Sequence, residues 1–171
     1  MRGGATPAQI GGFWWARHIK GEAVEELTAA AIVMREFAAE VNVASDKVVH
    51  TVGTGGDGAG LFNVSTACAL VAAGAGITVA KHGNRAASGG CGSADVLEAL
   101  GVRIELPPEG VERCINQGGI GFMFAPVFHP SMRHAGPVRR EIGIRTVFNV
   151  LGPLTNPAGV QNLLIGVAFP E

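Results

Sequence analysis

The apolar residues in the first forty positions are spaced as in amphipathic helices. From residue 23 to residue 40 they recur at intervals of three and four, which is the period of one helix face. These residues are Val24, Leu27, Ala31, Met34 and Phe37. The spacing predicts a helix over 23–40 and an earlier helix over 8–20. We interpret Trp14 and Trp15 in the earlier helix as packing residues, because large aromatic side chains contribute most when they are buried.

After Asn42 the pattern changes to short apolar runs that alternate with helical segments. Strand-like runs cover 47–52, 77–82, 102–106, 120–125, 147–151 and 163–169. Helical patterns cover 65–74, 93–100 with Ser93 as its N-cap, 108–117, and 131–141 with a break at Pro137. This alternation is typical of βαβ units and a parallel sheet. The sequence therefore predicts an α/β fold, with a small helical subdomain over 1–45 followed by an α/β domain over 46–171.

Composition and charge narrow the class of protein. The 171 residues are 47% hydrophobic and 16% charged, as in a globular protein with a substantial core. A formal net charge of −1 gives no reason to expect a nucleic-acid or anionic-membrane partner. The three cysteines lack CxxC spacing, so neither a zinc site nor a disulfide framework is expected. The longest apolar run, 67–80, is too short to span a bilayer, and no signal-peptide pattern is present, so we expect a cytoplasmic protein.

A glycine-rich loop lies between the first predicted strand and the helix that follows it. Four of the six residues in Gly53–Gly58 are glycine, so backbone N–H groups are free to converge on an anion. The next helix adds the positive end of its dipole, and Asn63, Ser65 and Thr66 at its start either cap it or bind the ligand. Asp57 would repel a phosphate. We therefore expect Asp57 to bind a sugar hydroxyl, or a cation that the phosphates share.

The loop after the second strand decides between two kinds of nucleotide site. Glycines in the first loop have the spacing of the dinucleotide-binding fingerprint, which also requires an acidic residue at the end of the next strand. That strand ends instead in Lys81, His82, Gly83, Asn84 and Arg85. A P-loop is excluded because no Gly-Lys-Ser/Thr follows the glycines. Parallel strands end at one edge of a sheet, so we expect both loops to face one phosphate-binding pocket.

Basic residues gather again after residue 125, where His129, Arg133, His134, Arg139 and Arg140 follow a predicted strand. The planar guanidinium of arginine matches a carboxylate bidentately, so one of the last two arginines is a candidate carboxylate ligand. A solvated basic helix is the alternative interpretation of this segment.

A series of motifs in this chain closely resembles the anthranilate phosphoribosyltransferase family of tryptophan biosynthesis. The motifs are Gly53–Gly58, Phe62–Thr66, Lys81–Arg85, Gly92–Glu98, Phe124–Pro126, His129-Pro130, Pro137–Arg140 and Phe148–Pro157. They cover nearly the whole chain in order. The resemblance implies a phosphoribosyltransferase or nucleoside-phosphorylase-like domain, which transfers phosphoribose from phosphoribosyl pyrophosphate to the amine of anthranilate with Mg²⁺ and releases pyrophosphate.

The resemblance also implies which residues bind each substrate. Ligands of phosphoribosyl pyrophosphate are implied at Gly53, Gly56, Asp57, Asn63, Val64, Ser65, Thr66, Lys81, Ser88, Gly89 and Ser93. Ligands of anthranilate are implied at Gly53, His82, Asn84 and Arg139, and a Mg²⁺ ligand at Ser65. No covalent nucleophile is implied. Catalysis would then rest on positioning and on stabilising the leaving pyrophosphate.

The chain departs from the family pattern in three ways. The family's first helices, which help to form its homodimer interface, are missing ahead of Met1. Its acidic pair that binds Mg²⁺ has no counterpart before Glu171. Leu61 stands where a hydroxyl residue is usual, and Gly89 where a second serine is usual. The resemblance therefore implies an internal piece of the enzyme.

Two alternatives remain open. A pyrimidine-nucleoside phosphorylase-like enzyme shares the architecture but usually carries Lys-His-Ser-Gly-Arg at the second loop, where this chain has Gly83-Asn84. The other alternative is an inert phosphoribosyl-binding fragment.

Overall fold

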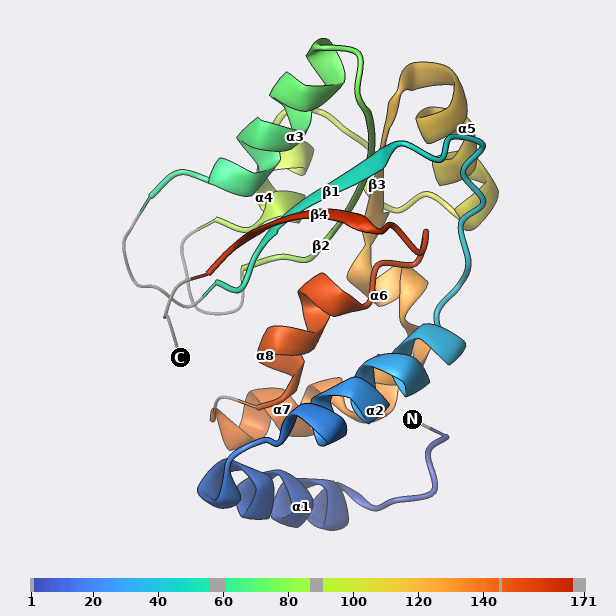
Figure 1. Cartoon of the computed structure of the whole chain (residues 1–171). Helices are drawn as coiled ribbons and strands as arrows, with labels where there is room; N and C mark the ends of the chain where they lie inside the picture. Colours follow the sequence, from blue (N-terminus) through green and yellow to red (C-terminus); the bar gives the residue numbers. More distant parts are fainter. Residues whose placement is uncertain (1, 56–60, 87–90, 145, 168–171) are drawn as a thin grey trace.

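The chain is built around a four-stranded parallel sheet with the strand order β3-β2-β1-β4 (Figure 1). The computed structural model describes residues 2–55, 61–86, 91–144 and 146–167. The strands are β1 (Val48–Gly53), β2 (Thr78–Gly83), β3 (Ile120–Phe124) and β4 (Asn162–Gly166). The register pairs Gly53 with Gly166 and Gly83 with Phe124, so the strands end together at one edge. The prediction of an α/β fold around a parallel sheet is confirmed.

Helices cover both faces of this sheet (Figure 1). α3 (Val64–Gly74) and α4 (Ser93–Ala99) lie on one face, and α5 (Pro108–Gly118) lies on the other. Successive strand residues point to opposite faces, so Phe124 packs with Leu97 of α4 whereas Met123 packs with Ile115 of α5. The same alternation places the neighbouring side chains of Lys81 and His82 on opposite faces of the sheet.

A helical layer, at the bottom of Figure 1, is assembled from two separate stretches of chain. The first contains α1 (Pro7–Lys20) and α2 (Val24–Glu36). The second contains α6 (Ala125–Phe128), a 3-10 turn at Pro130–His134, α7 (Gly136–Ile142), α8 (Phe148–Leu151) and a 3-10 turn at Gly152–Leu154. Trp14 is buried between them and meets Phe148 edge-on at 5.5 Å between ring centroids, so its interpretation as a packing residue is confirmed. Trp15 lies nearer the surface, with 46% of its area exposed.

Two predicted strands were wrong. Most of the predicted strand over 147–151 is helix α8 (Phe148–Leu151), because Asn149 Oδ1 accepts the Thr146 N–H at 2.9 Å and turns the backbone into a helix. Residues 102–106 belong to no strand of the described chain, although their polar and apolar residues alternate. Ile104 instead inserts its side chain beside α4 and Phe124, so packing takes the place of strand pairing.

Several predicted helix boundaries differ from those observed. α2 stops at Glu36 rather than residue 40, because the Ala39 N–H bonds outside the helix, to the Phe128 carbonyl at 2.9 Å. Gly92, not Ser93, is the N-cap of α4. The break within 131–141 falls at Ala135, and Pro137 lies in the first turn of α7, where a missing N–H costs nothing.

Gly121 in β3 provides a test of how tightly α5 packs on the sheet. An added Cβ would lie 2.5 Å from Ile115 Cγ1 and 3.1 Å from both Val111 Cγ1 and the Val111 carbonyl. We expect Gly121→Ala to lower the free energy of unfolding by about 1–3 kcal/mol, because α5 must move away from the sheet. Gly118→Ala in α5 is the matched control, since its Cβ meets nothing within 4 Å. Equal effects of the two variants in urea titrations would contradict this packing.

Candidate active site

The candidate site lies at the carboxyl ends of β1 and β2, beside the first turn of α3. Of the eleven implied ligands of phosphoribosyl pyrophosphate, Gly56, Asp57, Ser88 and Gly89 lie outside the described residues. The described ones are Gly53, Asn63, Val64, Ser65, Thr66, Lys81 and Ser93. Gly53 ends β1, and Gly55 follows it in the left-handed region at φ 69°, which favours glycine.

Lys81 is the cation at the centre of this site. Its side chain is only 2% exposed and points from β2 toward α3. The ammonium donates to the Thr51 carbonyl at 2.9 Å and to Ser65 Oγ at 3.2 Å. Burial lowers the pKa of Lys81 from 10.5 to about 8. In the part of the chain that the structure describes, no carboxylate pairs with it. A buried ammonium without a counter-ion is suited to binding an anion.

The first turn of α3 holds its hydroxyl groups next to this ammonium. Asn63 caps the helix: its Oδ1 accepts the Thr66 N–H at 3.0 Å and the Ser65 hydroxyl at 3.2 Å. Thr66 is buried and its Oγ1 has no partner within the described ranges, whereas the Val64 side chain is exposed. Of the two roles left open for Asn63, Ser65 and Thr66, the capping role is therefore observed for Asn63.

Arg139, an implied anthranilate ligand, lies near the end of α7 in the helical layer. Its guanidinium is partly buried, and burial lowers the pKa of Arg139. It makes no ion pair or hydrogen bond with any described residue, whereas Arg140 beside it is exposed. Of the two arginines, Arg139 is therefore the one whose environment suits a carboxylate.

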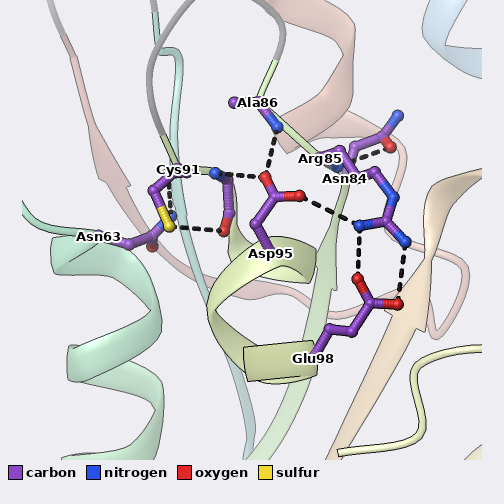
Figure 2. A network of polar contacts seen from close by, with 8 residues as sticks. Asn63, Asn84, Arg85, Ala86, Cys91, Asp95 and Glu98 are labelled. Atoms are coloured by element: carbon purple, nitrogen blue, oxygen red, sulfur yellow. Dashed lines mark hydrogen bonds and ion pairs between the residues drawn. The ribbon is translucent and has the colours of Figure 1, made fainter. Parts of the chain in front are cut away.

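The residues in and after the second loop, which begins at the end of β2, differ in their contacts. Asn84 is exposed; its Oδ1 accepts the Arg85 N–H at 2.8 Å and its carbonyl accepts the Ala94 N–H at 3.2 Å. Arg85 pairs with Asp95 and Glu98 of α4 (Figure 2). Its charge is therefore balanced by two carboxylates of α4. Ser93, the first residue of α4, is buried, and its Cβ lies 3.2 Å from the position of a Cβ on Gly83.

His82 lies on the face opposite Lys81, in a row of three buried imidazoles. The ring centroids are 6.4 Å apart between His50 and His82, and 4.9 Å apart between His82 and His129. Burial lowers the pKa of both His50 and His82 to about 3 and lowers that of His129. His82 Nδ1 lies 3.4 Å from the Gly152 carbonyl, which favours a neutral ring that donates from Nδ1. His50 could not be anticipated from the sequence, because a single histidine in a strand belongs to no motif.

The described residues do not by themselves form a metal site. They contain no group of three or more His, Cys, Asp or Glu side chains placed to bind one ion. Ser65, the implied Mg²⁺ ligand, has its oxygen 3.2 Å from the Lys81 ammonium, and a second cation at that oxygen would be repelled. Mg²⁺ in proteins usually binds through carboxylates and substrate phosphates, and a single hydroxyl does not meet that requirement.

Two family models match this chain. Residues 45–171 match the "Glycosyl transferase family, a/b domain", and residues 1–38 match the "Glycosyl transferase family, helical bundle domain". The chain belongs to this glycosyl transferase family. Every helix in the described ranges is too short or too polar to cross a membrane.

Several curated relatives of this chain are anthranilate phosphoribosyltransferases. The chain is 66% identical over 168 residues to the enzyme of Chloroflexus aurantiacus, covering 98% of this chain and 49% of that protein. The crystal structure of the Thermus thermophilus enzyme is 55% identical with a TM-score of 0.92, over 98% of this chain and 51% of that one. The Saccharomyces cerevisiae enzyme in complex with phosphoribosyl pyrophosphate and Mg is 33% identical with a TM-score of 0.86, over 94% and 46% of the two chains. The resemblance in the motifs is confirmed, and the chain spans about half the length of the curated relatives it matches.

Proposed function

We propose that this chain binds phosphoribosyl pyrophosphate and anthranilate, and supports transfer of the phosphoribosyl group to the anthranilate amine in tryptophan biosynthesis. The observation that carries this proposal is the buried Lys81 ammonium near the carboxyl end of β2, which pairs with no carboxylate among the described residues. The relatives named anthranilate phosphoribosyltransferase support it. We further propose a cytoplasmic homodimer for the complete gene product.

Lys81 and α3 would act on the leaving group. Pyrophosphate gains negative charge as its bond to the anomeric carbon breaks, while the sugar becomes cationic. A positive charge held in a dry site stabilises that charge strongly and needs no reorganisation during the reaction. The Ser65 and Thr66 hydroxyls and the N-terminus of α3 would add donors to the phosphates. The amine of anthranilate is itself the nucleophile, so none is required from the protein.

Arg139 and Asn84 would orient the acceptor. The guanidinium of Arg139 matches the anthranilate carboxylate, and the Asn84 side-chain amide is exposed at the end of β2. Gly53 and His82 are proposed to border the same substrate. Holding both reactants in place would supply most of the rate acceleration.

Mg²⁺ is proposed to bind mainly through the substrate phosphates, where it would neutralise part of their charge. Ser65 remains the proposed protein ligand, together with Asp57 in the loop outside the described residues. The position of the Lys81 ammonium means that Ser65 becomes a ligand only if that contact is exchanged for one to phosphate.

The test of this function uses the complete gene product that contains this chain. Loss of anthranilate fluorescence in the presence of phosphoribosyl pyrophosphate and Mg²⁺, with release of pyrophosphate, is the expected result. Phosphorolysis of thymidine in its place would establish the phosphorylase alternative. Binding of phosphoribosyl pyrophosphate without turnover would establish a binding module.

Arg139→Ala should raise the KM for anthranilate by about tenfold or more, because a charge-assisted hydrogen bond contributes about 1.5–3 kcal/mol. The KM for phosphoribosyl pyrophosphate should change little. Arg140→Ala is the matched control, since Arg140 is an exposed neighbour in α7. An unchanged KM for anthranilate in Arg139→Ala would refute the assignment.

A further inference from the structure

The two central strands of the sheet, β1 and β2, pair over a shorter stretch than their neighbours do. β2 stays paired with β3, and β1 with β4, up to the last residues of these strands. The register between β1 and β2 ends with the pair Val49–Val79. These two strands therefore part before they reach the candidate site at their carboxyl ends.

A continued ladder between β1 and β2 would involve Thr51. In a parallel ladder every second residue bonds to the two residues that flank its partner. Val49 lies opposite Val79, so the next residue of β1 to bond would be Thr51. Its N–H would donate to the Ala80 carbonyl, and its carbonyl would accept the His82 N–H.

Two of these backbone groups are bound by side chains of the sheet instead. The Thr51 carbonyl accepts the Lys81 ammonium at 2.9 Å, and the His82 N–H donates to His50 Nδ1 at 3.4 Å. The Lys81 ammonium thus takes the acceptor that a continued ladder would give to His82. The position of this ammonium in the candidate site depends on the gap between the two strands.

Asn156 binds the third group, the Ala80 carbonyl, from outside the sheet. Its side chain is buried, and its Nδ2 donates to that carbonyl at 2.9 Å. Its Oδ1 accepts the Ala158 N–H at 2.9 Å, which orients the carboxamide so that the NH2 group faces β2. The Thr155 hydroxyl donates to the Leu151 carbonyl at 3.0 Å and holds the same turn against the end of α8.

We propose that Asn156 is a positioning residue for Lys81: its carboxamide takes the place of the next ladder bond, keeps β1 and β2 apart, and leaves the Thr51 carbonyl to the Lys81 ammonium. The proposal rests on the function proposed above, in which Lys81 binds the phosphates of phosphoribosyl pyrophosphate. Asn156 touches no substrate in this role. It belongs to the motif Phe148–Pro157, whose residues have no substrate to bind in the proposed function.

Loss of the Asn156 amide would leave the buried Ala80 carbonyl without this donor, which is unfavourable. The ladder supplies the Thr51 N–H as a replacement, so β1 and β2 would pair for one further step. The His82 N–H would then take the Thr51 carbonyl from the Lys81 ammonium. A general loss of stability would have the opposite effect on the strands, because it would loosen them.

Asn156→Ala in the complete gene product is the primary variant. Asn162→Ala is its matched control, since Asn162 Nδ2 donates to the Val48 carbonyl at 3.1 Å, a bond of the same kind at the opposite end of β1. We expect Asn156→Ala to slow amide hydrogen exchange at Thr51 and His82 by about tenfold or more, and to raise the KM for phosphoribosyl pyrophosphate by a similar factor. The control should leave these three values within about twofold of those of the unaltered protein.

A double-mutant cycle shows whether Asn156 acts through Lys81. Binding of phosphoribosyl pyrophosphate is measured by calorimetry for Asn156→Ala in the unaltered protein and in Lys81→Met. Residues that act through one another are not additive, so Asn156→Ala should weaken binding by no more than about twofold in the Lys81→Met background. An equal loss in both backgrounds would overturn the proposal.

Unchanged or faster exchange at Thr51 and His82, or an equal effect of the control, would also overturn it. If Asn156→Ala does not fold, Asn156→Ser decides by the same criteria, since its hydroxyl keeps an acceptor for the Ala158 N–H but lacks the amide donor. An unaltered protein that does not bind phosphoribosyl pyrophosphate would overturn the proposed function instead. The exchange rates are measured without substrate and would still decide whether Asn156 keeps the strands apart, so the two failures are distinguishable.

Discussion

Lys81→Met is expected to lower kcat/KM for phosphoribosyl pyrophosphate by about thirtyfold or more, since removing one partner of a desolvated charge contact costs about 2–5 kcal/mol. The replacement keeps an unbranched side chain of similar length in a site that is 2% exposed, and removes only the ammonium. Lys47→Met is the matched control, because Lys47 is an exposed lysine just before β1. Anthranilate binding, measured by fluorescence titration, should change far less. Equal losses for both substrates would contradict the assignment of Lys81.

The same variant should not lower thermal stability. Burial reduces the pKa of Lys81 from 10.5 in the unfolded chain to about 8, so the folded protein holds this proton less tightly. The resulting penalty, on the order of 3 kcal/mol, is fully present below pH 8 and disappears as the pH rises through 10.5. Methionine removes the penalty but leaves the Thr51 carbonyl without this donor, which costs about 1–3 kcal/mol. We therefore expect an unchanged or higher Tm, measured at pH 7.

A pH titration separates this charge effect from a change of shape. In the unaltered protein the affinity for phosphoribosyl pyrophosphate should fall as the pH rises above about 8, because Lys81 loses its proton there. Lys81→Met should bind weakly at every pH with no transition near that value. A transition of equal size in the variant would show that another group is responsible.

The features that could be predicted from the sequence are those with a local signature. Gly53–Gly58, the run ending in Lys81, and the start of α3 at Asn63 each lie where a strand ends or a helix begins. Apolar periodicity and glycine content mark such points directly. Because parallel strands end at one edge, these loops could be placed together before the structure was known.

The features that were missed depend on contacts between distant residues. The segment 102–106 alternates like a strand but finds no partner, since Ile104 is buried by α4 and β3. Arg85 is a residue type that often binds anions, but Asp95 and Glu98 on a later helix neutralise its charge. The hydrogen bonds that Asp95 accepts from two backbone N–H groups could not be inferred, because the identity of a residue does not show which partner its backbone N–H binds.

Acidification below pH 6.5 is expected to destabilise the fold through His50 and His82. Burial lowers the pKa of each from 6.5 to about 3, so the unfolded chain binds protons that the folded protein excludes. The stability contributed by the neutral rings is complete above pH 6.5 and is lost as the pH falls toward 3. At pH 5 each ring should cost about 2 kcal/mol, and both together about 4 kcal/mol, relative to pH 7. Such a loss is a large part of the free energy of unfolding of an ordinary domain.

His50→Gln and His82→Gln isolate this effect, since glutamine keeps a polar side chain that does not titrate. Urea titrations between pH 4.5 and 7.5 should show that the free energy of unfolding falls less steeply with acid in each variant. In the double variant the two reductions should add. His18→Gln on the exposed surface of α1 is the control and should follow the curve of the unaltered protein. Coulombic repulsion from Lys81 also opposes protonation of both rings, and repulsion from His129 and His50 opposes protonation of His82. If the free energy of unfolding of the double variant falls with acid as steeply as that of the unaltered protein, groups other than His50 and His82 cause the acid sensitivity.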